Sequence, residues 1–226
     1  MPSIAENLTA VEQRIAAACQ RAQRPREDVL LVAVTKTRPL ADVLALRELG
    51  IHDIAENRAQ DVRDRAPSFP RDLRCHFIGS LQTNKAKYLP GLVTNVHTVD
   101  RVEIAAALNR EWEKAPALPP LRVLLQFNIA EEAQKSGAAT SEARELLARV
   151  REFPRLHVEG LMAMAPLADE AEASRPVFRA LRELRDRLQQ DSGVALPVLS
   201  MGMSGDFEVA IEEGATMVRV GSALFV

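Results

Sequence analysis

The chain has 226 residues, of which 47% are hydrophobic, 27% charged and 4% aromatic. It contains 29 basic and 31 acidic side chains, which gives a net charge of −2. This composition excludes a disordered, a collagen-like and a nucleic-acid-tail protein. The length suffices for a large core and lies near the limit at which one core stops growing, so we expect a single domain over residues 1–226.

The first predicted element is an N-terminal amphipathic helix. Ser3 and Glu6 form a capping box, and apolar residues then recur on one helical face up to about residue 24. A continuous apolar run over Val29–Lys36 follows, of the kind that a parallel strand buried on both faces requires. A second helix is then predicted over residues 39–50, because Pro39 suits a helix start and Gly50 a helix end.

The same alternation continues along the chain. Seven more strands are predicted, over residues 51–55, 74–78, 95–99, 122–128, 157–162, 197–201 and 217–220. Helical patterns separate most of them, over residues 58–65, 101–114, 141–152, 173–190 and 204–213. Eight units of about 28 residues each match the βαβ repeat, within the lower size range of a barrel. We therefore predict an α/β fold, a single (β/α)8 TIM barrel, in preference to an open doubly wound sheet.

The compartment and the partner classes follow from what the sequence lacks. No uninterrupted apolar run approaches the ~18 residues that cross a bilayer, and the N-terminus is not patterned as a secretory leader. Cys19 and Cys75 have neither disulfide-framework nor metal-ligand spacing. We expect a cytoplasmic protein that binds neither membrane nor nucleic acid, with any anion bound locally.

Chemistry is expected at the carboxyl ends of the strands, where barrel enzymes place their sites. Lys36 ends the first strand, and period-two alternation places it on the side of Val32 and Val34. If that side faces inward, Lys36 points into the barrel mouth and is partly desolvated, which favours the neutral amine that attacks an aldehyde to form a Schiff base. The alternative is a lysine that reaches solvent or pairs with a carboxylate such as Glu56.

Two segments near the end of the chain indicate an anion site. The segment Ser200–Asp206 follows a strand and begins a helix, so hydroxyls and unpaired N–H groups converge there. Arg219, Gly221 and Ser222 lie at the next strand end, and phosphate sites in this fold often use the loops after strands seven and eight. The alternative is two capped helices, with Ser204 as an N-cap and Arg219 in a salt bridge.

Other polar residues carry weaker signals. Asn57 either orients a ligand or caps the helix that follows it. His76 is expected to be a satisfied strand histidine, and the 4 histidines are scattered without ligand spacing, so no metal is predicted. The nucleophile-elbow, phosphate-loop and dinucleotide motifs are absent.

Five blocks that contain these residues run in order along nearly the whole chain: Ala33–Lys36, Glu56-Asn57, His76–Lys85, Leu199–Ser204 and Val218–Ser222. Together they closely resemble the pyridoxal-phosphate homeostasis protein family, whose members look like the N-terminal barrel of alanine racemase standing alone. Three departures are that Ala55 replaces a usual glycine, that Arg58 replaces a usual aromatic residue, and that the chain stops soon after Phe225.

The resemblance implies the third fold type of pyridoxal 5'-phosphate (PLP) proteins, with PLP held as a Schiff base on Lys36. Contacts to the phosphate are implied for four residues: Ser200, Ser204, Gly221 and Ser222. Arg219 would face the ring nitrogen or the phosphate, and Asn57 and Met201 would line the ring. Lys135 is either a second cofactor contact or an exposed loop lysine.

The resemblance also implies a function. Members of the family bind PLP in intracellular vitamin B6 homeostasis, where they are thought to buffer or supply it, and they have no established catalytic activity. An arginine near the pyridine nitrogen disfavours ring protonation and so weakens the electron sink that carbanion chemistry needs. We accordingly expect no catalytic residues, a monomer, and PLP-dependent apo-enzymes as recipients.

Two other functions stay open. An amino-acid racemase or a barrel aldolase with the same lysine needs another proton-transfer group, for which the chain offers His76, Tyr88 or Lys135. A racemase of this type uses a further domain, for which we expect the chain to be too short. A phosphate-binding barrel without aldehyde chemistry is the simpler alternative.

Overall fold

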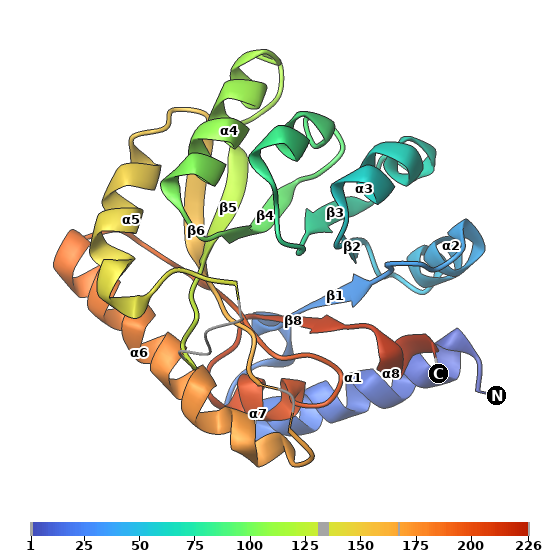
Figure 1. Ribbon diagram of the computed structural model, residues 1–226. Coiled ribbons are helices and arrows are strands. Elements are labelled where there is room, and N and C mark those ends of the chain that lie inside the picture. Colours follow the sequence, from blue (N-terminus) through green and yellow to red (C-terminus); the bar gives the residue numbers. More distant parts are fainter. Residues whose placement is uncertain (1, 131–135, 167, 226) are drawn as a thin grey trace.

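The computed structural model describes residues 2–130, 136–166 and 168–225. Eight parallel strands pair in chain order and close into a barrel through the pairing of the first strand with the last (Figure 1). The strands are β1 (Leu30–Val34), β2 (Asp53–Glu56), β3 (Arg74–Phe77), β4 (Asn95–Val99), β5 (Leu121–Gln126), β6 (Leu156–Met162), β7 (Val198–Ser200) and β8 (Met217–Val220). The predicted α/β barrel is confirmed, and the open sheet is excluded.

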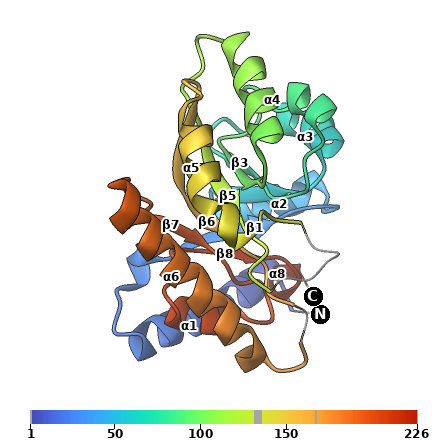
Figure 2. The ribbon, with the colours of Figure 1, turned by 60° about the vertical axis from the view of Figure 1, so that its left-hand side comes forward.

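Helices surround the barrel (Figures 1 and 2). In the described ranges the α-helices are α1 (Ile4–Arg21), α2 (Leu40–Glu48), α3 (Ala59–Arg65), α4 (Val102–Glu113), α5 (Ala143–Arg151), α6 (Arg175–Ser192), α7 (Phe207–Glu212) and α8 (Ser222–Phe225). Each predicted helix is present. The connection between β3 and β4 holds a 3-10 helix, η3 (Thr83–Tyr88), which the sequence pattern did not indicate.

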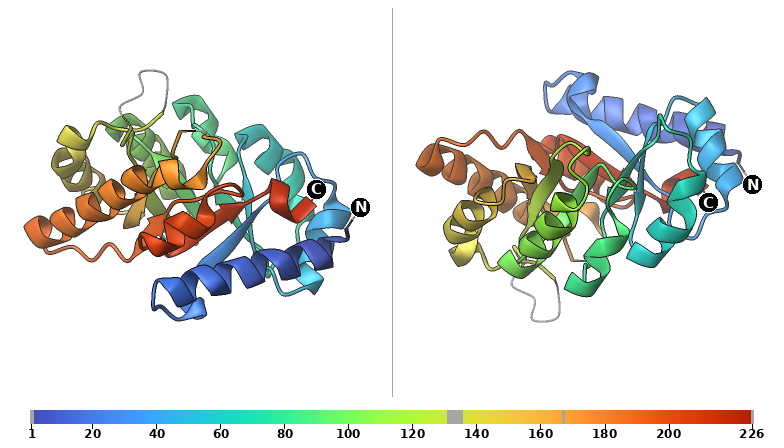
Figure 3. Two further views of the ribbon diagram at one scale, coloured as in Figure 1. Left: turned by 90° about the horizontal axis from the view of Figure 1, so that it is seen from below. Right: turned by 90° about the horizontal axis from the view of Figure 1, so that it is seen from above.

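The N-terminal helix α1 closes the ring between the last helices and α2. Its predicted capping box is present, since the Glu6 N–H donates to Ser3 Oγ at 3.2 Å and the Ser3 N–H donates to Glu6 Oε2 at 2.7 Å. The helix packs against α7 and α8, and the Asn7 side-chain amide donates to the Leu224 carbonyl at 3.2 Å. Figure 3 shows the start of α1 beside α8.

The interior of the barrel differs from the layer between strands and helices. That outer layer holds the large apolar core, whereas the inside contains a small apolar cluster built on Val32, Ala55 and Met217. Much of the remaining inside is polar: Asp53, His76, His97, Ser200 and Arg219 are all buried. This is unusual, because bulky aliphatic side chains ordinarily fill a TIM barrel. In the part of the chain that the structure describes, no helix has the length and apolarity that a membrane span needs.

Candidate functional site

Lys36 lies in a tight turn just beyond the end of β1. The strand ends at Val34, and the Arg38 N–H donates to the Thr35 carbonyl at 3.0 Å to close the turn. Thr37 has φ of 64°, a left-handed conformation that a β-branched residue rarely adopts. Lys36 is among the exposed residues, two positions beyond the end of the strand. Its partial desolvation stays a prediction.

A buried ion pair behind the turn holds it in place. Glu56 is fully buried, and its Oε1 accepts hydrogen bonds from Arg65 Nη1 at 2.6 Å and from Thr35 Oγ1 at 2.9 Å. Arg65 also donates to the carbonyls of Thr35 and Arg38, on either side of Lys36. Burial raises the pKa of Glu56, although the charge of Arg65 opposes this. The alternative pair of Lys36 with Glu56 is therefore wrong, since Arg65 takes that position.

A cavity of about 360 Å³ opens beside Lys36 at the carboxyl ends of the strands. This volume falls in the range of roughly 300–1,000 Å³ for small-molecule sites. Predicted site residues that line it are Lys36, Ser204, Arg219, Gly221 and Ser222. The lining residues that were not predicted as site residues include two polar side chains, Ser174 and Asp206. The Asp206 carboxylate accepts from the Met203 N–H at 2.6 Å and from Ser174 Oγ at 3.2 Å.

One end of the cavity is rich in hydrogen-bond donors. Ser204 Oγ accepts from the backbone N–H groups of Gly221 at 3.1 Å and Ala223 at 3.3 Å, which ties the loop after β7 to the start of α8. Ser204 is not the N-cap that the alternative required, because α7 begins only at Phe207. Across the described ranges, the N–H groups of Ser204, Gly205 and Ser222 donate no hydrogen bond. Unpaired donors around a cavity suit an anion such as a phosphate.

Arg219 supplies the positive charge of the cavity. It is 3% exposed, and it donates from Nη1 to Ser200 Oγ at 2.7 Å and from Nη2 to the Ala163 carbonyl at 3.2 Å. Burial lowers the pKa of Arg219 to about 10, so it remains charged at neutral pH. The salt bridge of the alternative interpretation is not seen, since none of the ion pairs among the described residues involves Arg219.

Ser200 and Met201 lie beneath the cavity and not in its wall. Both are fully buried, and the Ser200 hydroxyl is engaged by Arg219 and, at 3.0 Å, by His97 Nδ1. The direct contacts of Ser200 with a phosphate and of Met201 with a ring stay predictions. Ser200 ends β7 with its side chain in the barrel interior, where it contacts Arg219, whereas Met201 follows the strand and packs in the outer apolar core.

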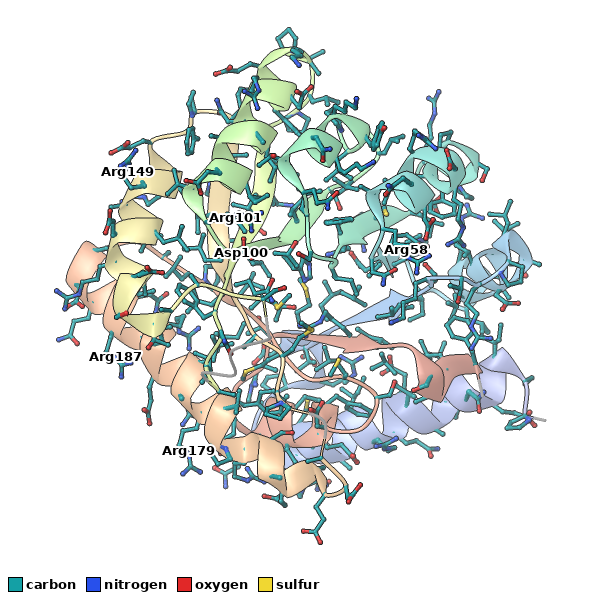
Figure 4. The ribbon with its side chains drawn as sticks, in the orientation of Figure 1. Arg58, Asp100, Arg101, Arg149, Arg179 and Arg187 are labelled. Carbon is teal, nitrogen blue, oxygen red and sulfur yellow. The ribbon has the colours of Figure 1, made fainter. Side chains whose placement is uncertain are left out.

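Asn57 also lies outside the cavity wall. It does not cap α3, whose N-cap is Arg58 without a side-chain hydrogen bond. Its backbone carbonyl packs on Gly79, where an added Cβ would lie 1.8 Å from the Asn57 oxygen, so only glycine fits there. The exposed Arg58 projects near the inner end of α3 (Figure 4) and does not line the cavity either. Lys135 lies outside the described residues.

The cavity thus combines an exposed primary amine, a buried guanidinium and a cluster of N–H and hydroxyl donors. An amine captures an aldehyde, and the cation with the donors neutralises a phosphate. PLP carries both an aldehyde and a phosphate, so the donor set fits that cofactor. Of the three candidate proton-transfer groups, His76 and Tyr88 do not line the cavity, and Lys135 lies outside the described residues. Among the residues described, no group of His, Cys, Asp and Glu is suited to a metal ion.

Comparison with known proteins gives the same fold and cofactor. The alanine racemase N-terminal domain family matches residues 7–226. Pyridoxal phosphate homeostasis proteins of Aquifex aeolicus and Pseudomonas aeruginosa are 42% and 43% identical, over 97% and 100% of this chain and 96% of each relative.

Solved structures agree. PipY of Synechococcus elongatus, solved with PLP bound, superposes with a TM-score of 0.80 at 31% identity, covering 96% of this chain and all of that one (100%). Alanine racemase of Clostridium difficile shares the fold at a TM-score of 0.73 and 16% identity, and the match covers 95% of this chain and 56% of the racemase.

Proposed function

The chain belongs to the pyridoxal phosphate homeostasis protein family, and we propose that it binds PLP and buffers or supplies it in vitamin B6 homeostasis. The observation that carries this proposal is that Lys36, Arg219 and the donor cluster around Ser204 share one cavity. The curated relatives are named for PLP homeostasis and not for a catalysed reaction.

The residues divide into an aldehyde end and a phosphate end. Lys36 would hold the aldehyde carbon as a Schiff base, because its amine lies at the cavity wall and no ion pair or hydrogen bond of the described residues occupies it. Ser204, Gly221 and Ser222 would hold the phosphate through hydroxyl and N–H donors. Arg219 would face the pyridine nitrogen or the phosphate, held from below by Ser200. When bound, PLP contributes a reactive aldehyde and an electron-withdrawing ring.

The remaining parts of the proposal concern context. We expect residues 1–226 to act as one domain and as a monomer, in the cytoplasm, with PLP-dependent apo-enzymes as recipients. Both described cysteines are free and buried, which suits a reducing compartment. A racemase needs a second proton-transfer group at the site, and the candidates His76 and Tyr88 lie away from the cavity wall.

The test is an absorption spectrum of protein reconstituted with PLP. We expect a Schiff-base band that is lost in Lys36→Ala and retained in Lys85→Ala, since Lys85 lies on η3 outside the cavity wall. A full band with unchanged affinity in Lys36→Ala would refute the assignment. Colourless protein that still binds phosphate esters would favour a plain phosphate site, and steady turnover of an amino acid would favour a racemase.

A further inference from the structure

A continuous chain of hydrogen bonds runs through the barrel interior beneath Arg219. Arg219 Nη1 donates to Ser200 Oγ at 2.7 Å, and Ser200 Oγ lies 3.0 Å from His97 Nδ1. His97 Nε2 lies 2.9 Å from His76 Nδ1, and His76 Nε2 lies 3.0 Å from Asp53 Oδ1. All five side chains are at least nine-tenths buried. This hydrogen-bond chain therefore joins the Arg219 guanidinium at the cofactor cavity to the Asp53 carboxylate at the other end of the barrel.

The two ends fix the direction of every link. An arginine can only donate, and an ionised aspartate can only accept. If both histidines are neutral, each has one donor and one acceptor nitrogen, so the Ser200 hydroxyl donates to His97, His97 donates through Nε2 to His76, and His76 donates through Nε2 to Asp53. A further charge between the two ends would have to be buried among the strands at high cost. Burial lowers the pKa of both imidazoles, which agrees with neutral rings.

The far end of the chain is anchored at the opposite mouth of the barrel. Asp53 begins β2 and receives a hydrogen bond from Arg74 Nε at 2.8 Å. It lines a second cavity, of about 530 Å³, that opens among the amino ends of the strands, with Glu159 and Asn95 on the same wall. Because parallel strands run from this mouth to the cofactor cavity, the chain spans the interior of the barrel from one end to the other.

At the near end, the chain leaves Arg219 with donors to spare. A guanidinium has five N–H donors, and the hydrogen bonds to Ser200 and to the Ala163 carbonyl use two, so three face elsewhere in the described structure. Planar guanidinium groups recognise ligands by orientation as well as by charge. Fixing one edge of the group on Ser200 therefore fixes which donors the cavity receives.

We propose that His76, His97 and Ser200 are positioning residues that couple Arg219 to Asp53 and hold the guanidinium, charged and in one orientation, against the PLP site. That PLP is the ligand rests on the proposed function. The direction of the hydrogen bonds is a property of the protein alone and does not depend on the ligand. Aliphatic side chains would fill the same interior without the cost of burying five polar groups, and they would leave the Arg219 guanidinium free to turn.

The first experiment needs no cofactor. Nitrogen-15 NMR of the imidazoles in PLP-free protein at pH 7 should show His76 and His97 neutral and protonated on Nε2, with signals assigned by His76→Gln and His97→Gln. An Nδ1-protonated tautomer or a doubly protonated ring at either position would overturn the proposed direction, whether or not the protein binds PLP.

The second experiment measures PLP affinity and the absorption maximum of the bound cofactor. Ser200→Ala should weaken binding about tenfold or more and shift the maximum, because it removes a charge-assisted hydrogen bond of Arg219, whereas Ser200→Thr keeps the hydroxyl and should restore both. Asp53→Asn should shift the maximum in the same direction with a smaller loss of affinity, although it lies at the other mouth. The control is Glu159→Gln, which removes a carboxylate from that mouth but leaves every hydrogen bond between Asp53 and Arg219 in place.

The outcomes separate the two claims. Wild-type protein that fails to bind PLP would contradict the proposed function. Wild-type binding with unchanged affinity and spectrum in Ser200→Ala and Asp53→Asn would overturn the positioning role. Equal shifts in Glu159→Gln and Asp53→Asn would also overturn it, because the effect would then be a general response to charge at that mouth.

Discussion

Removing Arg65 tests how the turn that carries Lys36 is held. In Arg65→Ala the fully buried Glu56 carboxylate loses its ion pair, and the carbonyls of Thr35 and Arg38 lose a donor. Breaking a buried pair by removing one partner costs about 3–5 kcal/mol. The Arg65 side chain is 24% exposed, so water replaces part of the interaction, and we expect a loss of about 2–4 kcal/mol in the free energy of unfolding. In a chain of this size, that lowers Tm by roughly 5–15 °C.

Urea unfolding at two pH values checks both the size and the cause of this loss. The pKa of Glu56 is already raised from its ordinary 4.5 by burial, and removal of the arginine should raise it further. Stability that depends on the protonated carboxyl is present at low pH and is lost as pH rises through the folded pKa. Arg65→Ala should therefore be less destabilised, relative to wild type, at pH 5 than at pH 7, and adding Glu56→Gln should recover part of the loss.

The matched control is Arg63→Ala, which removes an arginine of the same helix whose pair with Asp64 is exposed. It should unfold like wild type. An Arg65→Ala protein as stable as Arg63→Ala at pH 7, or equally destabilised at both pH values, would refute the role of the Arg65–Glu56 ion pair in holding the turn. PLP affinity should fall in Arg65→Ala alone, since only that variant releases the turn around Lys36.

Three further predictions concern the interior and the site. Arg219→Met should lower PLP affinity by about tenfold to a hundredfold, measured by titration of the absorption band, because it removes the charged donor of the cavity; unchanged affinity would place the anion site elsewhere. Gly79→Ala should destabilise the fold by about 3 kcal/mol or more in urea unfolding, because its Cβ would lie 1.8 Å from the Asn57 carbonyl oxygen; a wild-type midpoint would contradict that packing. Burial opposes ionisation of Asp53, but hydrogen bonds from Arg74 and His76 outweigh it and lower its pKa from 3.8 to about 2. This carboxylate should contribute about 2 kcal/mol above pH 4, lost as pH falls toward 2, and that part of the acid transition should be missing in Asp53→Asn.

The strands could be predicted because the barrel buries them on both sides. The run Val29–Lys36 is apolar for that reason, and the position of Lys36 above Val32 and Val34 followed from period-two alternation. The degree of exposure did not follow, because β1 ends at Val34 and the chain then forms a turn in which Thr35 is buried and Lys36 is exposed. Arg65, which contacts this turn from another helix, could not be assigned to it from the sequence pattern.

The contacts within the polar interior are the part that the sequence pattern alone could not indicate. His76 and His97 are 21 residues apart and have no motif spacing, so they looked like isolated strand residues. They meet because β3 and β4 are neighbours and both side chains point inward, which is known only once the barrel closes. The same closure brings Ser200 beneath Arg219. The signal present in the sequence was a polar residue at the inward position of several adjacent strands.

The most direct test of the account is to reduce the PLP-loaded protein with borohydride and to locate the tag by peptide mass spectrometry. The chain has 5 lysines, at positions 36, 85, 87, 114 and 135. The account predicts a single phosphopyridoxyl group, on the peptide that contains Lys36. A tag on any other lysine in place of Lys36, or no tag on protein that binds PLP, would contradict it.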